Sequence, residues 1–420
     1  MKPTHVLILG FCLTLLVSLA GRAANTWTEQ QLEAMKQLWI GKLQGLPASP
    51  SNRFADDPRA AKLGHLLFFD PAMSSNGEVS CATCHAPDEG FAERKPVSEG
   101  IARVTLNAPT IIGAAYSPWQ FWNGRADSLW AQALGPLENA KEMGGNRFAI
   151  ARYVTKTYAT QYESLFGSIP EVLTREPSLN ASPVTVPSHV TAWLRLEPEE
   201  REAVNRVFSN VGKAIEAYER LLIPNSRTWS RFDVYSQALS DPESKDLNLL
   251  SADEQEGFKL FVGEAGCVTC HSGSRLTDDL FHDTGFAAAG EPGRASGIEA
   301  VLAAEFNCIS PFSDAPADAC QNLRDLLSLY PNASTSAIPE NQRHAFKTPS
   351  LRHITQTAPY GTDGRYPTLK ALLEAKNDPA QGELKPLNLN AEQLRQLEAF
   401  LKALDTPLSV DRQWLTAPVK

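Results

Sequence analysis

The sequence predicts a mainly α-helical fold of two domains with long loops between the helices. Apolar residues recur every three or four positions in several segments, and no segment shows the sustained alternation of a β-strand. The chain has 420 residues, a length that favours two domains. It also contains 26 glycines and 29 prolines, which favour structured loops over continuous helices.

The motif Cys-x-x-Cys-His occurs twice, in the two runs Cys81-Ala-Thr-Cys84-His85 and Cys267-Val-Thr-Cys270-His271. This motif is typical of c-type haem attachment, in which both thiols form thioethers with the porphyrin and the histidine binds the iron. A zinc site built from the two cysteine pairs is the alternative. Zinc would leave both histidines unexplained, and the pairs lie much further apart than in a zinc ribbon. We therefore predict two covalent haems, each in a cytochrome c-like domain.

The N-terminus has the pattern of a secretory signal peptide. Lys2 precedes the apolar run 6–20, and small residues follow up to Ala24, so we expect residues 1–24 to be removed on export. The apolar run is short for a membrane span, and no later stretch reaches that length, so we do not expect an integral membrane protein. Export together with covalent haem indicates a bacterial periplasm.

The net charge of -9 and the pI near 5.5 argue against nucleic acid as a partner. Outside the signal peptide and the haem motifs, two cysteines remain, Cys308 and Cys320. An oxidising compartment favours a disulfide between them over two free thiols.

Helix signals divide the mature chain into an N-terminal haem domain, 25–235, and a C-terminal haem domain, 236–420. Thr28 with Gln31 and Ser251 with Glu254 form capping boxes at the starts of two helices, and Asn390 caps a last helix. A long amphipathic helix begins near Glu199, and Pro224 should stop it. Residues 225–250 are predicted to form the linker.

The first haem motif has no obvious second iron ligand, because the sequence has no histidine between His85 and His189. An iron with one free face can bind peroxide, whereas an iron with two strong ligands usually only passes electrons. His65 lies on an apolar segment, where a core histidine is expected rather than a ligand.

Aromatic and charged residues follow the first motif. Glu142 is either a carboxylate that moves the proton of a bound peroxide or an ordinary surface carboxylate or helix cap. Trp122 is either part of a haem site or a core residue. The residues alone leave both alternatives open.

Several longer motifs then match a known family. They are the runs Leu-Gly-x-x-Leu-Phe-Phe-Asp-Pro ending at Pro71, Phe121-Trp122-Asn123-Gly124-Arg125, Gly135-Pro136, Phe281-His282-Asp283-Thr284-Gly285, Lys347-Thr348-Pro349-Ser350-Leu351-Arg352 and Ala358-Pro359-Tyr360. Over nearly the whole mature chain, the sequence resembles bacterial di-haem cytochrome c peroxidases, and among them the MauG-like enzymes.

The resemblance implies roles for particular residues. Trp122 would lie between the haems, and Gln132, Pro136 and Glu142 would line the peroxide pocket of haem 1. Asn107 would bind a calcium ion between the domains, completed by backbone carbonyls near Lys347 and Pro349.

Departures from the family pattern are informative. The loop after the first motif lacks the histidine that caps haem 1 in many of these peroxidases, so haem 1 should be open at rest. Tyr366 stands where those enzymes have a methionine ligand to haem 2, which resembles MauG; Tyr360 is the competing ligand. Thr362 replaces a usual histidine, and the segment 264–266 has no tryptophan for hole transfer to a protein substrate.

These features predict a periplasmic oxidoreductase that uses hydrogen peroxide to form a high-valent di-haem state, which then oxidises a partner protein. The second hypothesis is a cytochrome c peroxidase that reduces hydrogen peroxide with electrons from a small cytochrome c or cupredoxin. The third, a non-catalytic electron carrier, conflicts with the open iron expected at haem 1.

Overall fold

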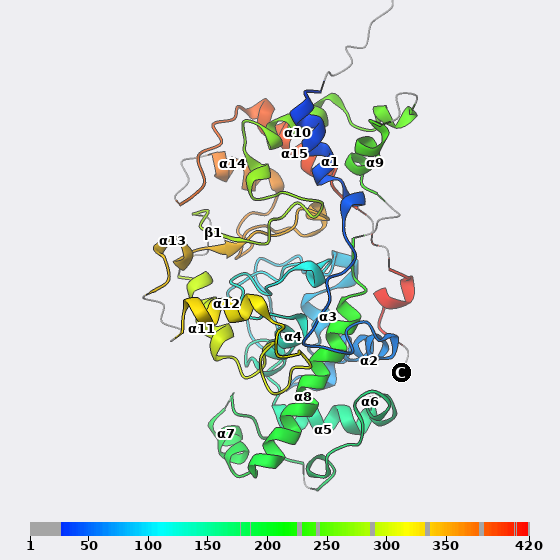
Figure 1. Ribbon diagram of the computed structural model, residues 1–420, viewed down its shortest axis with the longest axis vertical. Helices are drawn as coiled ribbons and strands as arrows, with labels where there is room; N and C mark the ends of the chain where they lie inside the picture. The colour runs from blue at the N-terminus through cyan, green and yellow to red at the C-terminus, as the bar shows by residue number, and fades with distance from the viewer. Residues whose placement is uncertain are drawn as a thin grey trace, which may run out of the picture.

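The computed structural model describes residues 27–176, 178–184, 186–224, 229–240, 244–285, 290–331, 337–377, 382–406, 408 and 410–418 (Figure 1). The predicted signal peptide lies outside these residues. Strands β1 (Phe281–His282) and β2 (Phe346–Lys347) pair antiparallel, and the other regular elements in these ranges are helical. The predicted mainly α-helical class is confirmed. Within the same ranges, no helix is long and apolar enough to cross a bilayer.

The first hydrophobic core is organised by one long helix, α8 (Pro198–Glu219), which carries the predicted helical stripe but ends before Pro224. Helices α2 (Pro58–Phe68) and α4 (Leu129–Glu138) pack against it. The α2–α8 contact requires Gly64, because an added Cβ would lie 1.8 Å from the Ala214 carbonyl oxygen. The remaining helices of this part are α3 (Cys81–Cys84), α5 (Arg147–Thr157), α6 (Ala159–Phe166) and α7 (Pro187–Leu194).

The second core lies at the other end of the molecule (Figure 1). Its central contact joins α10 (Ala252–Val262) to α15 (Ala391–Lys402), and Gly257 allows the close approach as Gly64 does in the first core. Helix α14 (Leu369–Asn377) packs beside α15. The predicted capping boxes at Thr28 and Ser251 are present, because each cap side chain accepts from the backbone three residues later. The predicted cap at Asn390 is confirmed and forms a box with Gln393 as well.

The predicted linker 225–250 is wrong for its central part. Residues Arg231–Ala238 form helix α9, and Phe232 and Tyr235 are buried in the second core. The helix is anchored by Asp233, whose carboxylate forms a buried ion pair with Arg352 at 2.5 Å. The segment has too few residues for a clear helical repeat, but its two aromatic residues lie three positions apart on one helix face.

An excursion between β1 and β2 carries α11 (Arg294–Ala303), α12 (Gln321–Leu329) and α13 (Glu340–Arg343) from the second half back to the first (Figure 1). Glu305 in this excursion forms an ion pair with Arg147 of α5 at 2.5 Å, and the buried Lys213 of α8 pairs with Asp314 at 2.7 Å. The predicted disulfide between Cys308 and Cys320 is confirmed and closes the loop between α11 and α12.

The two ends of the described chain lie on opposite cores. Helix α1 (Glu29–Leu38) packs its buried residues Met35 and Leu38 into the second core. The C-terminal turn Arg412–Leu415 packs Trp414 against the first core. The division of the chain at residue 235 stays a prediction.

Candidate haem sites

The first Cys-x-x-Cys-His motif forms the short helix α3, which begins after Ser80. Ser80 and Thr83 close a capping box around its first turn. His85 follows the helix, and its Nδ1–H donates to the Phe91 carbonyl at 3.1 Å. Phe91 is fully buried and has a φ of 54°, which turns its carbonyl towards the imidazole.

The second motif repeats this arrangement. Cys267–Thr269 form a single helical turn, and the Nδ1–H of His271 donates to the Leu276 carbonyl at 3.0 Å. Leu276 is also fully buried, with a φ of 53°. The Pro109 carbonyl is a further hydrogen-bond partner of His85, as the Pro349 carbonyl is of His271.

Both motifs fit a covalent haem. A ligand histidine usually donates its second ring N–H to a carbonyl, which fixes the tautomer and leaves Nε2 for the metal. Burial lowers the pKa of both imidazoles, to about 4 for His271, so they are neutral and able to bind iron. The four motif cysteines are not paired in disulfides. Burial raises the pKa of the Cys81 and Cys84 thiols to about 12, so they are neutral and enclosed rather than reactive at the surface.

The zinc alternative finds little support in the described residues. One group there has three ligand atoms close enough for a metal ion, formed by Cys270, Asp278 and His282. It uses one cysteine of the second motif, none of the first, and not His271. The imidazole of His282 is held instead between the carboxylates of Asp278 and Glu383, at 2.8 and 3.1 Å.

Gln132, Pro136 and Glu142 lie close together in one segment. Gln132 and Pro136 are four residues apart on α4, and therefore share one face of the helix. The chain then folds back, because the Met143 N–H donates to the Pro136 carbonyl at 3.1 Å. Glu142 lies in this turn and interacts electrostatically with Cys84 of the first motif. The segment is thus connected to the first haem motif.

Glu142 is neither a freely exposed carboxylate nor a helix cap. Burial raises the pKa of its carboxyl, and the Arg125 guanidinium opposes this shift. Arg125 lies over the Phe121 ring at 3.4 Å from the centroid. A Cβ added at Gly135, next to Pro136, would meet the same ring at 3.5 Å. Arg125, Phe121 and the end of α4 therefore form one packed group.

Trp122 joins the two halves of the protein. Its Nε1–H donates to the Asn107 carbonyl at 3.0 Å, and its own carbonyl accepts from the Lys347 N–H at 2.8 Å. Asn107 is buried, and its Nδ2 donates to the Lys95 carbonyl at 2.9 Å. Trp122 is therefore hydrogen-bonded to segments next to both haem motifs.

Tyr360 and Tyr366 are adjacent across a short antiparallel bridge. The Tyr360 hydroxyl donates to the Ile354 carbonyl at 2.8 Å, and burial raises its pKa to about 12. Tyr366 is partly exposed and interacts with its neighbour Arg365. The Tyr360 hydroxyl is therefore bonded to a backbone carbonyl, whereas Tyr366 interacts with an arginine side chain.

His65 is a core histidine, as predicted. It lies on α2 with 6% of its surface exposed, and its Nε2 contacts the Thr416 carbonyl oxygen at 2.9 Å. The rings of Phe69, Tyr218 and Trp414 surround it at 5.0–5.2 Å.

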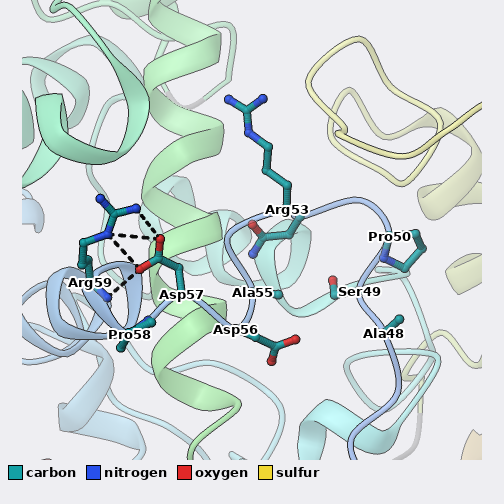
Figure 2. Close-up of a pocket in the computed structure, with 10 residues that line it drawn as sticks. Ala48, Ser49, Pro50, Arg53, Ala55, Asp56, Asp57, Pro58 and Arg59 are labelled. Atoms are coloured by element: carbon teal, nitrogen blue, oxygen red, sulfur yellow. Dashed lines mark hydrogen bonds and ion pairs between the residues drawn. The ribbon is translucent and has the colours of Figure 1, made fainter.

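A surface hollow of about 720 Å³ lies away from these residues and is lined by the single segment 48–59 (Figure 2). Arg59 and Asp57 pair with each other there at 2.7 Å, as the dashed lines show. The hollow contains none of the predicted site residues.

The sequence interpretation missed an extended repeat around the haem motifs. Each half has a short helical turn, Ala114–Tyr116 or Ile354–Gln356, then a bridged loop, then α4 or α14. The signal was the pattern Asn/Asp-Gly-Arg-x-x-Ser/Thr-Leu, which runs from Asn123 to Leu129 and from Asp363 to Leu369. Arg294 was also missed; it is 4% exposed and donates to the carbonyls of Asn123 and Gly124.

Two haem-attachment motifs, each with a carbonyl-anchored histidine, define a di-haem c-type cytochrome. A family model described as di-haem cytochrome c peroxidase matches residues 58–241. The chain is 29% identical over 395 residues to the methylamine utilization protein MauG of Methylorubrum extorquens, covering 92% of this chain and 88% of that protein. It is 28% identical over 352 residues to the cytochrome c551 peroxidase of Nitrosomonas europaea, covering 82% and 79%.

The fold agrees with a solved structure. The diheme peroxidase BthA of Burkholderia thailandensis superposes with a TM-score of 0.57 at 22% identity, over 83% of this chain and 86% of that one. This chain is similar to the di-haem cytochrome c peroxidases and to MauG over most of its length. It is a haem peroxidase, and this similarity together with the two motifs implies a c-type haem at each motif.

Proposed function

We propose that this protein uses hydrogen peroxide to oxidise a partner protein in the manner of MauG-like enzymes, with peroxide acting at haem 1 and Tyr366 as a ligand of haem 2. When bound, the two haems supply the redox chemistry. The observation that carries the proposal is the group around Glu142: a half-buried carboxyl, opposed by Arg125, beside a haem motif that no histidine follows until His189.

Glu142 is proposed to take the proton from the near oxygen of peroxide and return it to the far oxygen. A carboxyl whose pKa is raised by burial suits both steps, because it is a stronger base than an exposed carboxylate and can still give the proton back. Arg125 opposes this shift, since its positive charge favours the ionised form of the carboxyl. The Gln132 amide, one helical turn before Pro136, is proposed to orient the peroxide.

Trp122 is proposed to connect the two haem sites. A continuous path of short segments and hydrogen bonds runs from His85 through Pro109 and Asn107 to the indole of Trp122. From the Trp122 carbonyl, the path continues through Lys347 and Pro349 to His271. An indole in this position is well placed to share oxidising equivalents between the sites.

One observation favours Tyr366 over Tyr360 as the haem 2 ligand, and a second favours a tyrosine over a methionine. The Tyr360 hydroxyl is already engaged by the Ile354 carbonyl. No methionine follows Met143 in the sequence, so the C-terminal half offers no thioether in its place. Tyrosinate is an anionic ligand that favours high oxidation states of iron.

Calcium binding at Asn107 belongs to the same proposal. The Nδ2 of Asn107 donates to Lys95, which leaves Oδ1 as the side of the amide able to face a cation. Amide and carbonyl oxygens are ligands that Ca²⁺ prefers. Through Trp122, Asn107 is linked to Lys347, where the completing carbonyls are expected.

The mature protein is proposed to work in the periplasm after removal of residues 1–24. Covalent haem motifs, the apolar N-terminal run and the Cys308–Cys320 disulfide support this location.

A cytochrome c peroxidase that takes electrons from a small cytochrome c or cupredoxin is the second candidate, and the relatives named cytochrome c551 peroxidase favour it.

One experiment separates the two candidate functions. The haem-loaded protein is given hydrogen peroxide with candidate periplasmic proteins, or with a reduced cytochrome c, and Glu142→Gln serves as the control. An oxidised side chain found in a partner by mass spectrometry supports the first candidate. Peroxide consumption only with reduced cytochrome c supports the second.

A further inference from the structure

The turn that carries Glu142 is closed by a buried ion pair. Glu138 is the last residue of α4, Arg147 is the first residue of α5, and the chain between them forms the turn. The Arg147 Nη2 donates to the Glu138 Oε2 at 2.7 Å, and its Nε lies 3.3 and 3.2 Å from the two carboxylate oxygens. The Ser182 hydroxyl donates to the Glu138 Oε1 at 2.5 Å. Two side chains therefore hold this carboxylate at the point where α4 ends.

The guanidinium of Arg147 is itself fixed by other parts of the fold. Its Nη1 donates to the Asn205 Oδ1 of α8 at 2.7 Å and pairs with Glu305 of the excursion at 2.5 Å. It lies 4.8–5.5 Å from the centroids of three aromatic rings, those of Trp193, Phe208 and Phe306. Only 3% of Arg147 is exposed. Because a guanidinium with this many partners has little freedom to move, it is a firm anchor for the Glu138 carboxylate.

The closed turn is bonded to segments on both sides of the first haem motif. The Glu142 carbonyl accepts from the Ile101 N–H at 2.8 Å, and the Met143 carbonyl accepts from the Ser75 N–H at 2.8 Å. Ser75 precedes the motif in the sequence, and Ile101 follows it. The backbone at Glu142 is also tightly packed, because a Cβ added at Gly100 would lie 2.3 Å from the Glu142 carbonyl oxygen. The position of this turn therefore decides where the Glu142 carboxyl lies relative to the motif.

We propose that Arg147 and Glu138 are positioning residues, whose ion pair closes the turn and thereby places the Glu142 carboxyl at haem 1. Neither side chain needs to touch peroxide or haem, because each acts through the turn. A displacement of about 1 Å in a group that takes part in the reaction can slow it by roughly a hundredfold. The role of Glu142 in this inference rests on the proposed function, whereas closure of the turn by the ion pair does not.

The first measurement tests closure of the turn without using activity. Amide hydrogen exchange of the haem-loaded protein is compared with that of Glu138→Gln, which keeps the size of the side chain and removes its charge. We expect the Met143 and Gly145 amides, which donate to carbonyls at the end of α4, to exchange faster by about tenfold or more. Glu305→Gln is the matched control, because it removes a carboxylate from the same guanidinium at a residue outside the turn and its two helices. It should leave the exchange of these amides unchanged.

The second measurement tests whether the ion pair acts through Glu142. Rates of peroxide activation are measured by stopped-flow absorbance in Glu138→Gln, in Glu142→Gln and in the double variant. We expect Glu138→Gln alone to slow activation by about tenfold or more, and to have no further effect once Glu142 has been replaced. A merely structural role would slow activation by the same factor in both backgrounds, and that result overturns the proposal.

Unchanged exchange at Met143 and Gly145 in Glu138→Gln also overturns the proposal, and so does an equal change in Glu305→Gln. If Glu138→Gln does not retain both haems, Ser182→Ala takes its place. That variant removes only one donor to the same carboxylate, so it should change the exchange and the rate in the same direction. If Glu142→Gln leaves the rate unchanged, the proposed role of Glu142 fails, while the exchange measurement still decides whether the ion pair closes the turn.

Discussion

Asn107 and Thr362 are joined by a 2.8 Å hydrogen bond from backbone N–H to carbonyl oxygen, and the chain makes the reciprocal bond between their counterparts in the repeat. There the Lys347 N–H donates to the Trp122 carbonyl, also at 2.8 Å. Lys347 is the counterpart of Asn107, and Thr362 is the counterpart of Trp122. The two haem-binding segments therefore dock as the two halves of a symmetric dimer would.

Other contacts follow the same relationship. Gly90, just before the Phe91 that anchors His85, lies against Gln356. Arg275, just before the Leu276 that anchors His271, lies over the Tyr116 ring. Each half thus touches the loop whose carbonyl accepts from the other half's motif histidine. This contact fixes the relative orientation of the two motifs.

We expect haem 1 to be high-spin in the resting ferric protein and haem 2 to be low-spin. The sequence between His85 and His189 has no histidine that could close the sixth position of haem 1. Electron paramagnetic resonance of the isolated protein should show one signal of each kind. Two low-spin signals would contradict the open site.

Glu142→Gln should retain both haems and slow peroxide activation by roughly a hundredfold or more, since the amide cannot move a proton. Stopped-flow absorbance after mixing with hydrogen peroxide measures this rate. Glu99→Gln is the matched control, because Glu99 is exposed and pairs only with Lys95 among the described contacts. An unchanged rate in Glu142→Gln would remove this carboxyl from the mechanism.

Arg125→Gln should move the acid limb of the rate of peroxide activation to higher pH. Arg125 lowers the pKa of Glu142, so its removal raises that pKa, and the carboxylate base is lost at a higher pH as the solution is acidified. Stopped-flow rates measured as a function of pH test this expectation. A purely structural role for Arg125 would lower the rates without moving the limb.

Tyr366→Phe should leave haem 1 intact, change the low-spin spectrum of haem 2 and abolish the stable oxidised form that follows peroxide addition. Tyr360→Phe is the control, because its hydroxyl is bonded to Ile354. Absorption and paramagnetic resonance spectra of both variants make the comparison. If only Tyr360→Phe changes the spectrum of haem 2, the ligand is Tyr360. If neither variant changes it, the result favours the cytochrome c peroxidase function over the MauG-like one.

Arg294→Met should destabilise the protein by about 2–4 kcal/mol, because it leaves buried carbonyls without a donor. The guanidinium donates to Asn123 and Gly124 and lies over the rings of Trp119 and Phe281, at 4.5 and 4.0 Å from their centroids. Denaturant unfolding of the haem-loaded protein measures the loss. Arg53→Met, at an exposed arginine of the same molecule, should cost less than about 1 kcal/mol.

What the sequence predicts well is encoded locally. The haem motifs, the caps at Thr28, Ser251 and Asn390, and the long helix from Pro198 each depend on residues within a few positions of one another. The disulfide could also be predicted, since only two cysteines remain in the sequence once the haem motifs and the signal peptide are set aside.

What the sequence does not predict depends on distant partners. Helix α9 is held by the ion pair between Asp233 and Arg352. The two residues are far apart in the sequence, so no local pattern predicts that they pair. Arg294 looks like an ordinary surface cation until the fold brings the carbonyls of Asn123 and Gly124 next to it. The bonds of Trp122 to both halves likewise arise only from docking.

Each end of the described chain packs into the core of the other half, and this arrangement has a consequence for the stability of the protein. Residues Met35 and Leu38 complete the second core, while Trp414 closes over the first core and the Tyr218 hydroxyl donates to its carbonyl at 2.6 Å. Cutting the chain between the two motifs would therefore strip each core of a segment that belongs to the other half. The two haem units are interlaced rather than strung in tandem, and heating should melt them together in a single cooperative transition.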